Sequence, residues 1–204
     1  METTEQKLVQ QPIADVTFAF IDIETTGLAP AQNGRVCEVA LIRRKAGRRL
    51  DVFNQLINPD CLIPAEVTRI HGITNEMVED KPFFSKIAPK LISLLSDCAV
   101  VCHNAAFDVP FLAYEFYNAG LRFPPACILD TLEYARKHGD FTSNKLGNIS
   151  QELGFPKDGW HRALNDVVMT ENIFLHFLKI FESEGARTLS DLDNLQRIKR
   201  RRNQ

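Results

Sequence analysis

Two carboxylates two residues apart are the first residues of this chain that could do chemistry. Asp22 and Glu24 come at the end of a β-rich alternating segment, Val16–Ile23. In a strand, side chains two residues apart point to the same face, so both carboxylates would project together. Adjacent negative charges at a partly buried position need compensation, and a divalent cation is the simplest form of it. Taken alone, the pair is explained at least as well by a solvated loop beyond the end of the strand.

Two further clusters place acidic and polar residues near the starts of helices. In the segment 103–108, Asp108 would be the N-cap of the helix that follows, and Asn104 alone is equally consistent with a turn residue. In the third cluster, His161 precedes the last long helix and Asp166 lies in its first turns. A histidine with a pKa of about 6.5 can act as a general base at neutral pH. A lone histidine in such a place is more often a surface or capping residue.

Together the clusters supply four carboxylates and one histidine, each near the end of a strand or the start of a helix. Two Mg²⁺ ions about 3.5–4 Å apart, held by such carboxylates, form a clamp for displacement at a phosphodiester. Mg²⁺ prefers oxygen ligands and keeps several waters, so a few carboxylates suffice. The combination predicts metal-dependent phosphodiester hydrolysis. A Mg²⁺ ion with a purely structural role is a further alternative.

The elements that must position these residues predict one α/β domain. Three β-rich segments joined by short turns predict an antiparallel meander, and from Pro64 onward helices and strands alternate. We therefore expect a mixed sheet flanked by helices. The meander strands are expected at residues 16–23, 36–42 and 50–57, later strands at 99–102 and 127–129, and helices at 82–95, 109–119, 132–137, 145–153 and 163–181.

The domain organisation expected for the 204 residues has three parts. Residues 1–15 are polar and predict a flexible N-terminal arm, residues 16–182 form the catalytic domain, and residues 183–204 form a short helix and a basic tail. The basic tail carries +5, from Arg197, Lys199, Arg200, Arg201 and Arg202, and the whole chain carries −2, so the rest of the chain carries −7. An acidic body that binds a polyanion needs cations at its active site, and the tail is expected to add electrostatic affinity.

Cysteine usage and the N-terminal sequence predict a cytoplasmic protein. The chain has 5 cysteines and no C-x-x-C pair, which indicates buried thiols in a reducing compartment. No basic region followed by an apolar stretch begins the chain, so no signal peptide is expected. No apolar run approaches the roughly 20 residues that span a bilayer, so no membrane association is expected.

The three motifs, in this order, resemble the DEDDh (DnaQ-like) family of 3′–5′ exonucleases. They are D-I-E-T-T-G-L at 22–28, H-N-A-A-F-D at 103–108, and His161 with Asp166. The similarity covers roughly residues 16–182. Within the family the chain looks closest to the proofreading epsilon subunit of bacterial DNA polymerase III, because the segments at 70–74 and 129–132 also resemble that branch.

The resemblance implies a ribonuclease-H-like fold and a site with two divalent ions, Mg²⁺ or Mn²⁺. Four carboxylates would hold the metals: Asp22, Glu24, Asp108 and Asp166. His161 would deprotonate the attacking water, and hydrolysis of the terminal phosphodiester would release nucleoside 5′-monophosphates. Four other residues would lie near the terminal nucleotide: Thr26, Leu28, His71 and Asn104.

The expected substrate is a nucleic acid with a free 3′ end. Single-stranded or frayed DNA is favoured by the resemblance only, with roles in replication proofreading or repair and a DNA polymerase as a candidate partner. Trimming of RNA 3′ ends is the alternative, because proteins tell RNA from DNA at the 2′-hydroxyl and no single residue here reports on that group. A third alternative is a non-catalytic nucleic-acid-binding or polymerase-associated module. The complete five-residue set argues against it, since clustered carboxylates repel phosphate.

Overall fold

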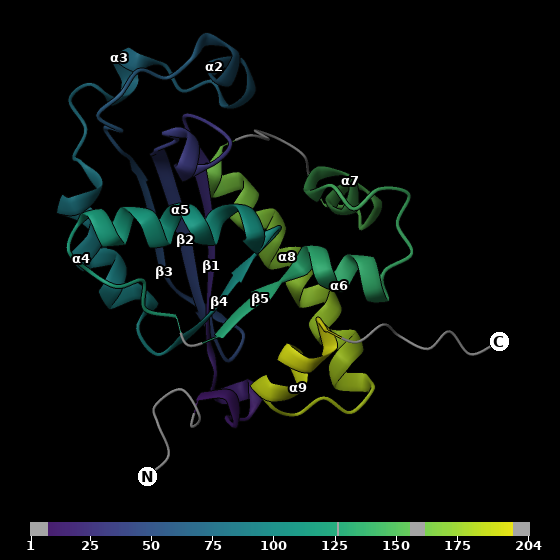
Figure 1. Ribbon diagram of the computed structural model, residues 1–204. Helices are drawn as coiled ribbons and strands as arrows, with labels where there is room; N and C mark the ends of the chain where they lie inside the picture. Colours follow the sequence, from purple (N-terminus) through teal and green to yellow (C-terminus); the bar gives the residue numbers. More distant parts are fainter. Residues whose placement is uncertain (1–7, 126, 156–161, 198–204) are drawn as a thin grey trace.

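A computed structural model describes residues 8–125, 127–155 and 162–197, which surround one five-stranded sheet (Figure 1). The strands lie in the spatial order β3-β2-β1-β4-β5. Their bounds are β1 Thr17–Thr25, β2 Val36–Lys45, β3 Arg48–Leu56, β4 Cys98–Cys102 and β5 Cys127–Asp130. The first three strands form an antiparallel meander, and β4 and β5 run parallel to β1. The expected mixed sheet is confirmed.

Helices cover both faces of this sheet (Figure 1). The long helix α8 packs on one face, and α4 and α5 pack on the other. The helices are α2 Ala65–His71, α3 Asn75–Val78, α4 Phe84–Leu95, α5 Ala105–Asn118, α6 Thr131–His138, α7 Leu146–Glu152, α8 Ala163–Ser183 and α9 Leu189–Leu195, with 3-10 turns η1 Ile13–Asp15 and η2 Pro30–Gln32.

The alternation of side chains along β1 decides which face the acidic residues share. Phe18 and Phe20 both contact Phe174 of α8, with ring centroids 4.9 Å and 5.4 Å apart. Asp22 and Glu24 have the same parity as these phenylalanines, so they continue the same face of the strand. That face leads from the middle of α8 towards the start of the helix.

β1 extends two residues beyond its expected end. It pairs with β2 as far as Thr25, and Glu24 lies opposite Glu38. Asp22 and Glu24 are therefore both strand residues, and the alternative of a solvated loop is wrong. The extension depends on hydrogen bonds to β2, which the apolar pattern of β1 alone does not reveal.

The helix after β4 begins earlier than expected, which changes the position of Asp108. α5 starts at Ala105 rather than at residue 109, so Asp108 lies inside its first turn and is not the N-cap. Asn104 is the N-cap and has left-handed backbone angles, with φ 75°. The carboxylate of Asp130 accepts hydrogen bonds from the backbone N–H groups of Asn104 and Ala105, at 2.9 Å and 3.0 Å. This distant carboxylate satisfies N–H groups that would otherwise need a local cap.

The described part of the N-terminal segment packs against the domain. Leu8 and Ile13 are buried in the same apolar core as α8, and Pro12 bridges to Thr188. Residues 8–15 thus differ from the expected flexible arm, because they carry apolar side chains that the core accepts. The expected terminal helix is present as α9, and it buries Leu189 in that core. The division of the chain at residues 16–182 and 183–204 stays a prediction.

Four of the five cysteines are buried as expected, namely Cys37, Cys98, Cys102 and Cys127. Cys61 is exposed, contrary to expectation. It lies in the loop between β3 and α2, outside the apolar layers of the sheet. Within the described residues, none of the helices combines the length and the apolar character that a membrane span requires.

Candidate active site

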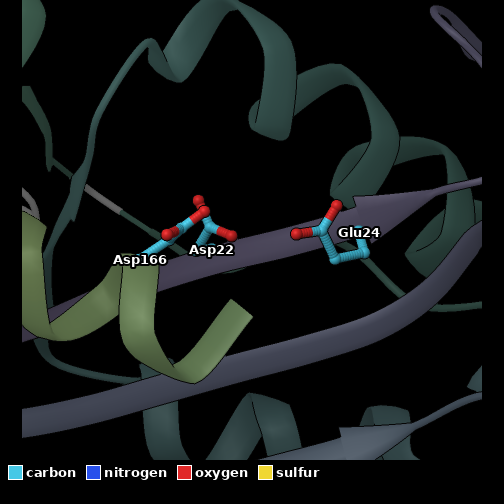
Figure 2. A group of neighbouring side chains, drawn as sticks. All are labelled: Asp22, Glu24 and Asp166. Atoms are coloured by element: carbon cyan, nitrogen blue, oxygen red, sulfur yellow. The ribbon is translucent and has the colours of Figure 1, made fainter. Parts of the chain in front are cut away.

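Three carboxylates from two distant segments meet at the end of β1. Asp22 and Glu24 of β1 and Asp166 of α8 each offer an oxygen, and these oxygens all lie within 4.8 Å of one another. Figure 2 shows the Asp166 carboxylate beside that of Asp22, with Glu24 projecting farther along the same strand. The expected grouping of these three residues is therefore present in the structure.

Asp108 adds a fourth carboxylate from the opposite face of the sheet. Its side chain is buried, in the first turn of α5. Burial raises the pKa of Asp108 to about 8, while backbone hydrogen bonds, one of them with Ile23 of β1, act in the opposite direction. The bond with Ile23 holds the carboxylate against β1. The charge of Asp108 is in turn one of the causes that raise the pKa of Asp22.

Burial and neighbouring negative charges disfavour the ionised forms of Asp22, Glu24 and Asp108. Burial first, and then the charges of Asp108 and Asp166, raise the pKa of Asp22 well above its usual value. Burial, followed by the charges of Asp166 and Glu38, raises the pKa of Glu24 to about 8. A bound divalent ion would stabilise the ionised form of these carboxylates and so lower their pKa values. The set consists of oxygen donors only, which fits Mg²⁺ or Mn²⁺.

An ion pair between a buried carboxylate and a partly exposed arginine, which sequence analysis missed, fixes the start of α8. Glu38 of β2 is fully buried and accepts hydrogen bonds from Nε and Nη2 of Arg162, at 3.2 Å and 2.9 Å. The same carboxylate accepts the backbone N–H of Ala163 at 3.2 Å, which caps the helix. Because Asp166 lies one turn further on, this pair sets its distance from β1. The sequence did offer a signal for this role, because Glu38 is an acidic residue within an otherwise apolar strand.

Asp130 has a similar role on the other side of the site. Besides holding the start of α5, its carboxylate accepts the backbone N–H of Leu132 at 2.8 Å and so caps α6. Its own backbone N–H donates to Oε1 of Gln196 at 2.9 Å. The Asp130 side chain therefore ties the helix that carries Asp108 to the start of α6, and the backbone of the same residue ties β5 to Gln196 in the segment that follows α9. In the sequence, Asp130 stands out only as part of the segment 129–132, which resembles the epsilon-subunit branch of the family.

The residues expected near the terminal nucleotide differ in exposure. Leu28 is 81% exposed, and Asn104 is also exposed. Thr26 is buried, and its hydroxyl accepts the backbone N–H of Arg35 at 3.0 Å. His71 is buried too, and its Nδ1 accepts the backbone N–H of Ile73 at 3.0 Å. Leu28 and Asn104 thus have side chains free to touch a ligand, while Thr26 and His71 shape the surrounding backbone. His161 lies outside the described residues.

Comparison with known proteins identifies relatives along most of the chain. A family model described as "Exonuclease" (RNase_T) matches residues 19–174. The 3′–5′ exonuclease DinG of Bacillus subtilis is 35% identical over 179 residues, 87% of this chain. The DNA polymerase III PolC-type protein of Thermotoga maritima is 33% identical over 89% of this chain, and the DNA polymerase III subunit epsilon-like protein of Rhodobacter capsulatus is 32% identical over 90%. The chain spans 19%, 13% and 27% of the length of these three proteins, respectively.

Solved structures confirm the ribonuclease-H-like fold expected from the resemblance. Exonuclease X in complex with 5′ overhanging duplex DNA superposes with a TM-score of 0.69 over 88% of this chain and 99% of that chain, at 24% identity. E. coli exonuclease I in complex with a dT13 oligonucleotide superposes with a TM-score of 0.68 over 83% of this chain and 43% of that chain, at 21% identity.

Proposed function

This chain belongs to the exonuclease family whose model matches residues 19–174, and from that premise we propose that it is a 3′–5′ exonuclease. It hydrolyses the terminal phosphodiester of a DNA strand and releases nucleoside 5′-monophosphates one at a time. The observation that carries the proposal is the convergence of Asp22, Glu24 and Asp166 within 4.8 Å, with buried Asp108 beside them. Such a cluster repels a phosphate unless it holds cations, so it suits a metal-assisted nuclease better than a plain nucleic-acid binder.

The proposed cofactors are two Mg²⁺ or Mn²⁺ ions held by these four carboxylates. When bound, the ions supply Lewis acidity that stabilises charge on the phosphoryl and leaving oxygens. The protein contributes a fixed, partly buried frame, because Glu38 and Asp130 hold the helices that carry Asp166 and Asp108. His161 is proposed to take the proton of the attacking water, since imidazole titrates near neutral pH.

The proposed substrate is DNA with a single-stranded or frayed 3′ end. The names of the relatives support DNA, since they include polymerase III proteins, and exonuclease X was solved with duplex DNA. The same names support the proposal of a role in replication proofreading or repair, with a DNA polymerase as partner. RNA trimming stays the alternative.

A digestion experiment tests the function and the substrate together. The 5′-labelled substrates are matched single-stranded DNA, duplex DNA with a mispaired 3′ end, and RNA, each with Mg²⁺, Mn²⁺ or excess EDTA. We expect a ladder that shortens from the 3′ end, release of mononucleotides, faster digestion of DNA than of RNA, and no digestion in EDTA.

Asp22→Asn and Asp15→Asn are the matched variants for this experiment. Both replace a carboxylate by an amide, but Asp15 is exposed in η1 at the other end of β1. Only Asp22→Asn should abolish digestion. Full activity in EDTA, or digestion from the 5′ end, contradicts the proposal. Faster digestion of RNA than of DNA would show that RNA is the substrate.

A further inference from the structure

A cavity of about 600 Å³ opens beside the candidate metal site. Its walls come from the turn before α5, from α6, from the loop before α7 and from the first turn of α8. Asp166 lines it, so it is continuous with the carboxylate cluster, while Asp22 and Glu24 do not line it. Ligand pockets in proteins measure roughly 300–1,000 Å³, so a nucleotide fits this volume. Apart from Asp166 and Asn104, the residues that line it have no part in the function proposed above.

The cavity combines cations with an apolar wall. Arg136 and Lys145 line it, and both are exposed to solvent. Arg136 pairs with Glu133 at 2.8 Å, but the same carboxylate also pairs with Lys137 at 2.9 Å, so one negative charge serves two cations. Apolar side chains, among them Phe107 and Leu146, supply surface for a sugar or a base.

The wall that carries Lys145 is held in place by hydrogen bonds from two sides. Nε2 of His103 donates to the backbone carbonyl of Asn144 at 3.1 Å. Nδ1 of His103 lies 2.8 Å from the hydroxyl of Thr131 at the start of α6. On the other side, the hydroxyl of Thr142 bonds to the carboxylate of Glu152 in α7. The loop before α7 is thus tied to α6 and α7, which gives Lys145 a defined position.

We propose that this cavity binds the nucleotides directly upstream of the terminal one, with Lys145 and Arg136 holding their phosphates. The proposal rests on the function proposed above and names the part of the substrate that this surface takes. An ammonium and a guanidinium are the groups that hold phosphates, and the acidic site beside them needs such cations. Asn104 is exposed and lines the cavity as Asp166 does, so a strand held in the cavity would pass beside both residues.

The test compares a substrate that has upstream nucleotides with one that has none. The first is a short oligothymidylate, and the second is the p-nitrophenyl ester of thymidine 5′-monophosphate. We expect Lys145→Ala and Arg136→Ala each to lower the ratio of kcat/KM for the oligonucleotide to that for the ester about tenfold. The dependence of log kcat/KM on log salt for the oligonucleotide should flatten by about 0.7 per lost phosphate contact.

Two control variants separate this site from a general effect of charge. Lys90→Ala removes an exposed cation from α4, a helix that does not line the cavity, and should leave the ratio unchanged. Lys145→Arg keeps the cation and should restore most of the ratio. All variants change exposed side chains, so thermal melts should match the wild type.

The outcomes separate this proposal from the proposed function. If the wild type digests the oligonucleotide but the ratio does not change in Lys145→Ala, the cavity proposal is wrong and the exonuclease stands. If the wild type digests neither substrate, the exonuclease proposal is wrong. In that case the cavity proposal is tested by binding, with fluorescence anisotropy of a labelled oligothymidylate and with Ca²⁺ in place of Mg²⁺. A lower affinity of Lys145→Ala than of Lys90→Ala supports the cavity proposal, and equal affinities overturn it.

Discussion

At the scale of single residues, the carboxylates of the site work against the stability of the fold. Burial and mutual repulsion raise the pKa of Asp22, Glu24 and Asp108, so each must either keep its proton or gain a cation. Active sites often hold such unfavourable groups because the chemistry requires them. Substituting one of them should therefore have opposite effects on activity and on stability.

Asp22→Asn is the substitution that shows these opposite effects. The metal-free wild type must take up a proton to bury Asp22 at neutral pH, whereas the amide is buried without this cost, so the metal-free variant should melt several degrees above the metal-free wild type. The loss of a metal ligand should lower kcat by about 10³-fold or more. Thermal melts in EDTA and single-turnover rates measure the two effects. A variant that melts below the wild type in EDTA would show that repulsion is not the dominant cost at this position.

His161→Ala tests the proposed general base. We expect a rate loss of about 10²–10⁴-fold with metal affinity largely retained, because imidazole is a poor ligand for Mg²⁺ compared with oxygen. If His161 is the general base, the pH–rate profile of the variant should lose the acidic limb that protonation of this histidine would cause in the wild type. Single-turnover rates across pH, combined with a Mg²⁺ titration, measure this. If the variant only needs more Mg²⁺ and regains the full rate at saturation, His161 is a metal ligand instead.

At the scale of elements, the site depends on how α8 is attached to β2. The ion pair between Glu38 and Arg162 joins residues 124 positions apart, and the Glu38 carboxylate also caps α8. Glu38→Gln should cost about 1–3 kcal/mol of unfolding free energy, because the buried backbone N–H of Ala163 and the partly exposed Arg162 lose a charged acceptor. It should also weaken Mg²⁺ binding, because Asp166 is no longer held at its distance from β1.

Asp51→Asn is the matched control for Glu38→Gln. It breaks the pair between Arg43 and Asp51, which is partly exposed and lies towards the other end of the meander. Isothermal titration with Mn²⁺ and urea unfolding compare the two variants. Equal metal affinity in Glu38→Gln and in the wild type would show that α8 keeps its place without this ion pair.

The segment after α9 also holds the fold together, so a test of the basic tail must leave this segment in place. The side chain of Gln196 bonds to the backbone of Ile128 and Asp130 in β5. Truncation after Leu195 therefore removes a structural contact together with the tail, and it should lower the melting temperature. Truncation after Arg197 keeps this contact and removes only the cations beyond it.

We expect the chain truncated after Arg197 to melt like the wild type but to bind single-stranded DNA with a flatter salt dependence. The tail beyond Arg197 has four cations, Lys199, Arg200, Arg201 and Arg202, so the slope should change by up to about 3. Anisotropy titrations at several salt concentrations measure this slope. An unchanged slope would mean that the tail is only a solvated terminus.

At the scale of the whole molecule, the proposed metal binding should be linked to folding through pH. The folded-state pKa values of Glu24 and Asp108 are about 8, above their unfolded values of 4.5 and 3.8. The folded state thus binds more protons between these limits, so the metal-free protein loses stability as pH rises from about 5 to about 8. Divalent ions need the ionised carboxylates, so their binding strengthens over the same range.

Mg²⁺ should therefore raise the melting temperature more at pH 8 than at pH 6. At pH 8, with Mg²⁺ at roughly one hundred times its Kd, the expected rise is about 5–10 °C for a chain of this size. Thermal melts in Mg²⁺ and in EDTA across pH measure it, and Asp22→Asn should reduce the rise. A rise that is equal at both pH values would argue against proton release from these carboxylates.

The sequence by itself determined the elements and the order of the motifs. The alternation in β1 and the helical spacing in α8 depend on residues only a few positions apart, so their approximate bounds could be predicted without a structure. The family also follows from local motifs, since the acidic residues occur in a recognisable order. These features determine which side chains are available for chemistry.

The tertiary structure alone decided where those side chains lie and what holds them. Asp108 was expected to be an N-cap, but the carboxylate of Asp130, distant in sequence, satisfies the start of α5 and leaves Asp108 inside the helix. The role of Glu38 is visible only in the folded chain, where it lies opposite Glu24 and accepts a hydrogen bond from Arg162. Such positions depend on hydrogen bonds and charges between distant segments, and no local pattern carries that information because only folding brings the partners together.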